Sequence, residues 1–170
     1  MKYLLRLSAA LLCIFAVFSC TNTPPDDPAK PDPVKKTPRD TVIRLSIEGE
    51  QCAFANKAEY GIFVPATEEK LRGALILQHG CGMEQFGITR PYDLQYQAFA
   101  KKWNLAVVET ALHGDCGVWK DPSSGSGYSL FKMLSTAGQK SSHPELSNAP
   151  LLIFGHSAGG YWSLEMLREY

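Results

Sequence analysis

Residues 151–170 read LLIFGHSAGGYWSLEMLREY, and this stretch decides the fold. The apolar run at residues 151–154 predicts a short buried strand. Residues 158–170 carry Leu164 and Leu167 at a spacing that predicts a helix with these two side chains on its inner face. Ser157 therefore lies where a strand turns directly into a helix.

Small residues surround this serine, in the sequence Gly155-His156-Ser157-Ala158-Gly159. They allow the backbone to reverse tightly, which holds the serine hydroxyl exposed as a nucleophile. The start of a helix also directs free N–H groups and a partial positive charge at that position. Ser157 is the candidate nucleophile, and Gly155, His156 and Gly159 form the turn. The alternative is a serine in a tight turn without chemistry, because G-x-S-x-G also arises by chance.

The preceding chain alternates strands and helices. Strands are predicted at residues 41–47, 60–64, 73–77 and 105–108, helices at residues 92–103 and 128–139, and a polar loop at residues 113–127. Two simple strands followed by strand–helix repeats predict an α/β sheet with right-handed crossovers.

The Gly155–Gly160 motif and the His79-Gly80 loop resemble the α/β-hydrolase superfamily. Trp119 and the runs Gly-Ser-Gly (125–127), His-Pro-Glu-Leu (143–146) and Ala-Pro-Leu (149–151) resemble bacterial secreted hydrolases similar to polyhydroxybutyrate depolymerases and carboxylesterases. The resemblance covers residues 41–170, the first half of that fold. It implies an α/β fold with a mostly parallel sheet of about five strands, its C-terminal half missing. It also implies a serine hydrolase acting on small esters or polyesters, without cofactor or metal.

This architecture places an oxyanion donor in the loop after the central strand, where His79-Gly80-Cys81 stands. The backbone N–H groups of Cys81 and Ala158 would then hold the negative oxygen of a tetrahedral intermediate. The alternative is a glycine turn with no catalytic part.

The triad of this superfamily follows the order Ser, Asp or Glu, then His. Only Glu165 and Glu169 follow Ser157, about 12 and 18 Å along the helix at its rise per residue, and no histidine follows. The four upstream histidines are poor substitutes: His79, His113, His143 and His156. We therefore expect a truncated chain that is inactive alone. The alternative is a non-catalytic surface lipoprotein or a ligand-binding remnant.

The resemblance also pairs two cysteines, because Cys81 and Cys116 follow strands that are neighbours in this fold. A disulfide between them needs Cα atoms about 4.4–6.8 Å apart, and it would leave Cys52 as a free thiol. No C-x-x-C motif is present, so a zinc or redox site has no support.

Residues 1–19 have a positive start and a short apolar stretch, as in a secretory signal. Val17-Phe18-Ser19-Cys20 resembles the lipidation box of bacterial lipoproteins, which implies lipidation at Cys20 and an exported, membrane-anchored protein on the periplasmic face or cell surface. Six of the eleven prolines lie in residues 20–40, which predicts a disordered tether before a domain at 41–170. The alternatives are a plain signal peptide or a short buried helix.

The 170 residues include 17 basic and 17 acidic side chains, and 45% of the chain is hydrophobic. This is an ordinary globular composition. The balanced charge predicts no nucleic-acid partner.

Overall fold

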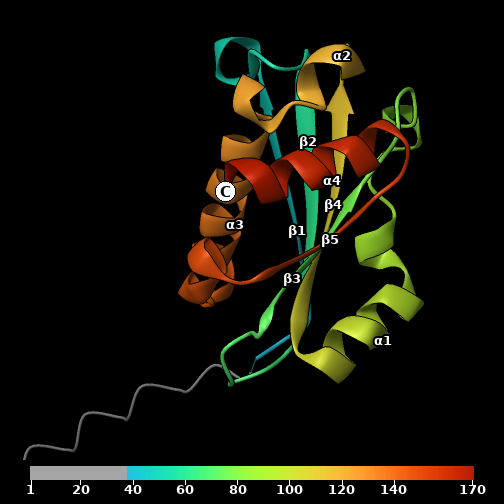
Figure 1. The fold of residues 1–170 in the computed structure, drawn as a ribbon. Coiled ribbons are helices and arrows are strands. Elements are labelled where there is room, and N and C mark those ends of the chain that lie inside the picture. The colour runs from blue at the N-terminus through green and yellow to red at the C-terminus, as the bar shows by residue number, and fades with distance from the viewer. Residues whose placement is uncertain (1–37) are drawn as a thin grey trace, which may run out of the picture. The chain divides into compact units, whose positions relative to one another are not determined.

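The computed structural model describes residues 38–170, which form five strands and their connecting helices (Figure 1). The strands are β1 (Thr41–Glu48), β2 (Lys57–Val64), β3 (Gly73–Gln78), β4 (Leu105–His113) and β5 (Leu151–Gly155). The α-helices are α1 (Leu94–Trp103), α2 (Cys116–Trp119), α3 (Ser126–Ser141) and α4 (Ala158–Glu169). Short 3₁₀ turns are η1 (Gly49–Cys52), η2 (Glu84–Phe86), η3 (Arg90–Tyr92), η4 (Pro122–Ser124) and η5 (Pro144–Asn148). The predicted signal and Cys20 lie outside the described residues.

The strands form one sheet in the order β1-β2-β4-β3-β5. β2 is antiparallel to β1 and to β4, whereas β3 is parallel to β4 and to β5. Four of the five strands therefore run in one direction, and β2 opposes them. This confirms the predicted α/β fold with a mostly parallel sheet of five strands. All six residues of β3 are buried, as expected for a central parallel strand with both faces covered.

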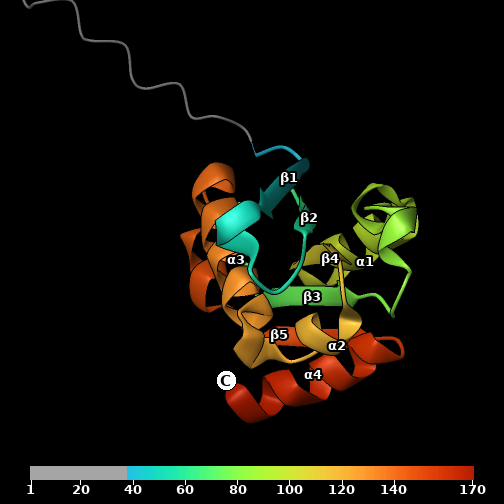
Figure 2. The ribbon, with the colours of Figure 1, turned by 90° about the horizontal axis from the view of Figure 1, so that it is seen from above.

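Helices cover both faces of the sheet, with α3 and α1 on opposite sides (Figure 2). Successive residues of a strand point to opposite faces. Ala74 and Ile76 join the larger core, which includes residues of α3 and α4, whereas Leu75 and Leu77 join a smaller core that includes Ala100 of α1. The carboxyl ends of the parallel strands β3 and β5 lie together, and α4 begins at that end of the sheet.

The predicted inner face of α4 is wrong. Leu164 and Leu167 are 56% and 77% exposed, whereas Trp162 and Met166 are buried. The indole Nε1 of Trp162 donates a hydrogen bond of 2.9 Å to Ser126 Oγ on α3. Trp162 and Met166 are spaced i, i+4, so the sequence of α4 contains two apolar stripes, and packing against α3 selects the one with the larger side chain.

Several boundaries also differ from the predictions; β4, expected at residues 105–108, extends to His113. The loop expected at residues 113–127 contains α2, whose start is capped by Asp115 through the N–H of Gly117. Asp40 was assigned to the tether, but its carboxylate accepts the N–H of Ala66 and pairs with Lys101. These bonds lower the pKa of Asp40, chiefly through Lys101, and attach this residue to the domain.

Candidate active site

Ser157 lies between the last residue of β5 and the first residue of α4. Its backbone has φ 52° and ψ −119°, a conformation that side-chain-bearing residues rarely adopt and that costs about 1–3 kcal/mol. The side chain is exposed, and its hydroxyl makes no hydrogen bond within residues 38–170. The turn therefore holds an accessible hydroxyl in a strained position.

The glycines of this turn are required by close approach of the backbone. A Cβ on Gly155 would overlap the carbonyl oxygen of Gly159, and a Cβ on Gly159 would overlap the carbonyl oxygen of His79. The N–H of His156 also donates to the carbonyl of Gln78 at 3.2 Å, which ties the turn to the end of β3. The turn and the loop after β3 are thus packed against each other.

The first turn of α4 leaves one donor available. Gly159 N–H donates to His156 O at 2.8 Å, and Gly160 N–H donates to Ser157 O at 2.9 Å. The N–H of Ala158 has no protein acceptor among the described residues. Such a group at a helix N-terminus, directly after Ser157, is suited to bind an anionic oxygen.

The residue predicted to carry the second donor, Cys81, lies in the loop after β3. A Cβ on Gly80 would lie 3.2 Å from Ser157 Cβ, so the loop touches the nucleophile turn. The loop closes through a hydrogen bond of 3.2 Å from Met83 N–H to Gly80 O, with Gly82 at φ 71°. Cys81 stands between these glycines, and no acceptor within residues 38–170 takes its N–H.

A disulfide joins Cys81 to Cys116, with Cα atoms 5.5 Å apart. It connects the loop after β3 to α2, the helix after β4. Cys52 is free and buried, and burial raises the pKa of its thiol.

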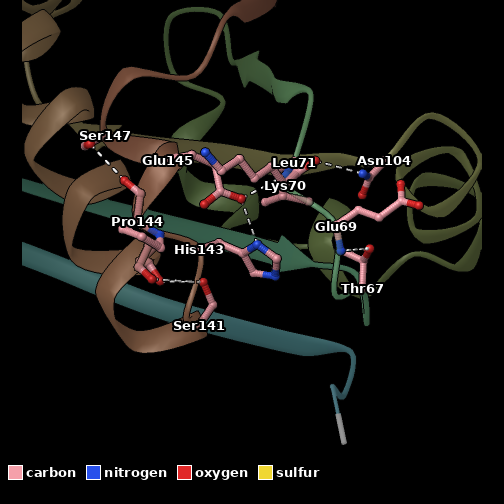
Figure 3. A network of polar contacts seen from close by, with 12 residues as sticks. Thr67, Glu69, Lys70, Leu71, Asn104, Ser141, His143, Pro144, Glu145 and Ser147 are labelled. Atoms are coloured by element: carbon pink, nitrogen blue, oxygen red, sulfur yellow. Dashed lines mark hydrogen bonds and ion pairs between the residues drawn. The ribbon is translucent and has the colours of Figure 1, made fainter. Parts of the chain in front are cut away.

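None of the described histidines is bonded to Ser157. His113 Nε2 lies 2.9 Å from Glu59 Oε2, so its acid partner is Glu59 on β2. His143 Nδ1 lies 2.9 Å from Glu145 Oε1, which also accepts the N–H of Leu71 (Figure 3). Because Leu71 precedes β3, this pair lies at the end of the sheet opposite Ser157.

The other two histidines lie close to the turn. His156 is exposed, and a Cβ on Gly80 would lie 2.9 Å from its Nδ1. His79 is engaged by backbone groups through both ring nitrogens. The two acids after Ser157 are also unsuited to a triad: Glu165 pairs with Arg168 at 2.9 Å on α4, and Glu169 is exposed.

Beside the turn lies a cleft of about 330 Å³ that the sequence analysis did not find. Its apolar lining includes Leu77, Met83, Phe86, Tyr96 and Phe154, and His79 and His156 border it. These residues come from four separate segments, so only the fold brings them together. One signal in the sequence was a carboxylate inside an apolar strand.

That carboxylate is Glu109 of β4, which also lines the cleft. Its Oε2 accepts the N–H of Thr89 at 2.6 Å and the N–H of Arg90 at 2.7 Å. Glu109 therefore anchors η3, which precedes α1.

Within residues 38–170, no group of three or more His, Cys, Asp or Glu side chains is arranged to hold a metal ion. Over the same residues, none of the helices has the length and apolar character needed to cross a bilayer.

No protein-family model matches the sequence, and no curated protein matches it significantly. Solved structures with a similar arrangement include an ester hydrolase from the Lake Arreo metagenome (17% identity, TM-score 0.46, 76% of this chain and 39% of that one). Another is a poly(3-hydroxybutyrate) depolymerase from Bordetella parapertussis (13% identity, TM-score 0.46, 78% of this chain and 48% of that one). A third is a hyperthermophilic esterase from Pyrobaculum calidifontis (18% identity, TM-score 0.47, 78% of this chain and 41% of that one). The chain spans less than half the length of these three proteins. Similarity at this level assigns no activity.

Proposed function

We propose that this chain carries the nucleophile and the oxyanion hole of a serine hydrolase that acts on carboxylic esters. The observation that carries the proposal is the strained, exposed Ser157 between β5 and α4. A serine with ordinary backbone angles would serve equally well in a structural turn. Strain of this kind is kept where the surrounding structure enforces it, and such positions cluster at active sites.

The chemistry follows from the groups around Ser157. Its Oγ attacks the ester carbonyl carbon while its proton passes to a general base. This attack forms a tetrahedral intermediate. The negative oxygen of that intermediate accepts hydrogen bonds from the N–H groups of Cys81 and Ala158. One such donor contributes about 3–4 kcal/mol to catalysis. Collapse of the intermediate then expels the alcohol and leaves an acyl group on Ser157.

We assign the general base and its acid to polypeptide outside these 170 residues, because no described histidine bonds to Ser157. The topology indicates where such a segment would dock. α4 follows β5 on the same face as α3, so a right-handed crossover would bring a following parallel strand to the free edge of β5. Residues after the carboxyl end of that strand would lie beside Ser157.

The cleft supports an apolar acyl or alcohol group as part of the substrate. Five apolar side chains line it, and His156, which precedes the nucleophile, borders it. A small ester or a polyester segment would place its apolar part against these side chains, and Arg90 and Glu109 also line the cleft. Export and membrane anchoring through lipidated Cys20 belong to the same proposal, because they place the enzyme with extracellular esters.

The decisive experiment compares two forms of the protein. One is the 170-residue chain, and the other is that chain joined to the polypeptide encoded downstream of Tyr170. Both are treated with a fluorophosphonate probe and assayed with nitrophenyl acetate. We expect slow labelling of the short form and an increase of orders of magnitude in the long form. Ser157→Ala should abolish this gain, whereas Ser147→Ala, at the opposite end of the sheet, should retain it.

Other outcomes would contradict parts of the proposal. If the short form turns over the ester at enzyme-like rates and needs Ser157, a described histidine is the base, and His156→Ala is the first variant to make. If neither form reacts at Ser157, the alternative of a ligand-binding lipoprotein without catalysis is favoured.

The anchoring is tested separately. Cys20→Ala should release the protein from the membrane fraction or leave its leader uncleaved. Unchanged fractionation together with an unchanged mass would contradict lipidation at Cys20.

A further inference from the structure

The carbonyl of Gly80 is held from two sides. His79 Nδ1 lies 2.6 Å from Gly80 O, and the N–H of Met83 donates to the same oxygen at 3.2 Å. Gly80 itself touches the nucleophile turn, since a Cβ there would lie 3.2 Å from Ser157 Cβ. The side chain of His79 thus acts on a peptide group beside the nucleophile.

The other ring nitrogen determines the tautomer of His79. The N–H of Leu112 on β4 points at His79 Nε2 at 2.8 Å. A backbone N–H can only donate, so Nε2 accepts with its lone pair, and the proton of the neutral ring resides on Nδ1. Burial of the ring, which packs 5.0 Å from Trp119, lowers the pKa of His79 and favours this neutral form. Nδ1–H is therefore the donor to Gly80 O.

A carboxylate supports the same tautomer. Glu84 Oε2 lies 3.9 Å from His79 Nδ1, and it is buried without a hydrogen-bond partner among the described residues. A negative charge on this side of the ring favours a proton on Nδ1 over one on Nε2.

The orientation of Gly80 O has a consequence for its neighbour. The Gly80–Cys81 peptide is planar and trans, so the N–H of Cys81 points opposite to the carbonyl of Gly80. We propose that His79 is the positioning residue of the oxyanion hole: its Nδ1–H fixes the Gly80–Cys81 peptide and thereby aims the N–H of Cys81. This inference rests on the proposed function for its catalytic meaning, but its geometric part can be tested alone.

Two substitutions separate the roles of the two ring nitrogens. The amide nitrogen of asparagine matches the position of Nδ1, so His79→Asn keeps a donor for Gly80 O and loses the acceptor for Leu112. The amide oxygen of glutamine matches Nε2, so His79→Gln keeps the acceptor and loses the donor. A role limited to packing predicts similar effects for both variants, whereas positioning predicts a difference between them.

The geometric test is NMR of the full chain. In the wild type, ring ¹⁵N shifts should show a protonated Nδ1 and an unprotonated Nε2, and the reverse tautomer would overturn the inference. The residual dipolar coupling of the Cys81 N–H reports its direction. It should be retained in His79→Asn and changed in His79→Gln, while couplings in β3 and β4 stay constant. An unchanged Cys81 coupling in His79→Gln would also overturn it. If His79→Gln does not fold, the inference is tested by the ring ¹⁵N shifts of the wild type and by the Cys81 N–H coupling of His79→Asn.

The catalytic part is tested by fluorophosphonate labelling of the long form described above. His79→Gln should slow labelling by about 10²-fold, the effect of losing one oxyanion donor, and His79→Asn should retain most of the rate. Equal rates in the two variants would contradict positioning. If the wild type fails to label, the proposed function fails, and the NMR result still decides the orientation of Cys81.

Discussion

At the scale of single residues, Ser157 is the point where stability and chemistry conflict. Its backbone angles suit glycine, yet a hydroxyl is needed there for nucleophilic attack. The surrounding contacts enforce this conformation, since the turn is bonded to the end of β3 through His156 N–H and Gln78 O. The strain is therefore expected to be measurable as a loss of folding stability.

Replacing Ser157 by glycine should raise the free energy of unfolding by about 1 kcal/mol, because glycine adopts this conformation without strain. Ser157→Ala serves as the control, since it removes the hydroxyl and keeps the strain. Urea unfolding followed by circular dichroism measures the difference between the two variants. Equal stability of both would show that the conformation costs nothing.

At the scale of elements, the junction between β5 and α4 contains two adjacent glycines, of which only Gly159 is required by close packing. A Cβ on Gly159 would overlap the backbone of His79 and Gln78, whereas the nearest atom to a Cβ on Gly160 lies at 3.4 Å. Both glycines are in the first turn of α4. Comparing alanine substitutions at the two positions therefore distinguishes an effect of close packing from an effect of helix propensity.

We expect Gly159→Ala to destabilise the protein by about 1–3 kcal/mol, because α4 must move away from β3. Gly160→Ala should be neutral or stabilising by up to about 1 kcal/mol, since alanine favours a helix over glycine. Thermal unfolding of the two variants beside the wild type measures this. A similar loss in both would contradict the packing argument.

The Cys81–Cys116 disulfide links two elements at the site and closes a separation of 35 residues. By the loop-entropy relation, removing it should cost about 3–4 kcal/mol. Dithiothreitol should lower the urea midpoint of the wild type. The double variant Cys81→Ser, Cys116→Ser should start at that lower midpoint and not respond to the reductant. A wild-type midpoint insensitive to complete reduction would contradict the prediction.

At the scale of the whole molecule, no segment within residues 38–170 pairs with the outer edge of β5. Leu152 and Phe154 are 54% and 63% exposed, and β5 contains no charged residue. Natural edge strands are usually protected by charges, bulges or covering segments. An apolar edge of this kind favours association with another polypeptide.

Leu152→Lys should therefore weaken concentration-dependent self-association of the 170-residue chain, as measured by sedimentation velocity. Leu167→Lys places the same charge on the exposed face of α4 and is the matched control, with a smaller effect expected. If neither substitution, or both equally, changes association, the edge of β5 is not the contact.

Acid should destabilise the folded chain in two steps. Burial lowers the pKa of His79 below 6.5, so the unfolded chain binds more protons as the pH falls through 6.5, and stability is lost from there down to the folded pKa. Burial tends to raise the pKa of Glu145, but bonds from Leu71 N–H and His143 outweigh it and lower the pKa, so a further loss follows below about 4.5.

Urea midpoints measured between pH 4 and 8 test this. His79→Asn should make the urea midpoint less dependent on pH near pH 6, and it should leave unchanged the loss of stability below pH 4.5. A wild-type profile that rises toward acid would contradict both assignments.

Much of the fold could be predicted because local patterns specify it. Apolar runs, the helical spacing before Trp103 and the small residues around Ser157 are properties of adjacent residues, and each corresponds to an element of the structure. The strand-to-helix turn at Ser157 could be located for the same reason, since only small side chains fit where the backbone reverses.

The sequence by itself determined the five strands, the helices α1, α3 and α4, their order and the serine between β5 and α4. Only the tertiary structure decided which stripe of α4 is buried, because Trp162 and Leu164 both satisfy helical spacing and contact with α3 selects between them. It also decided the partner of His113, since the pairing of β2 with β4 brings Glu59 to it. The role of His79 depends on Leu112, 33 residues away, because a hydrogen bond from β4 to the loop after β3, and not a local pattern, sets the position of its proton.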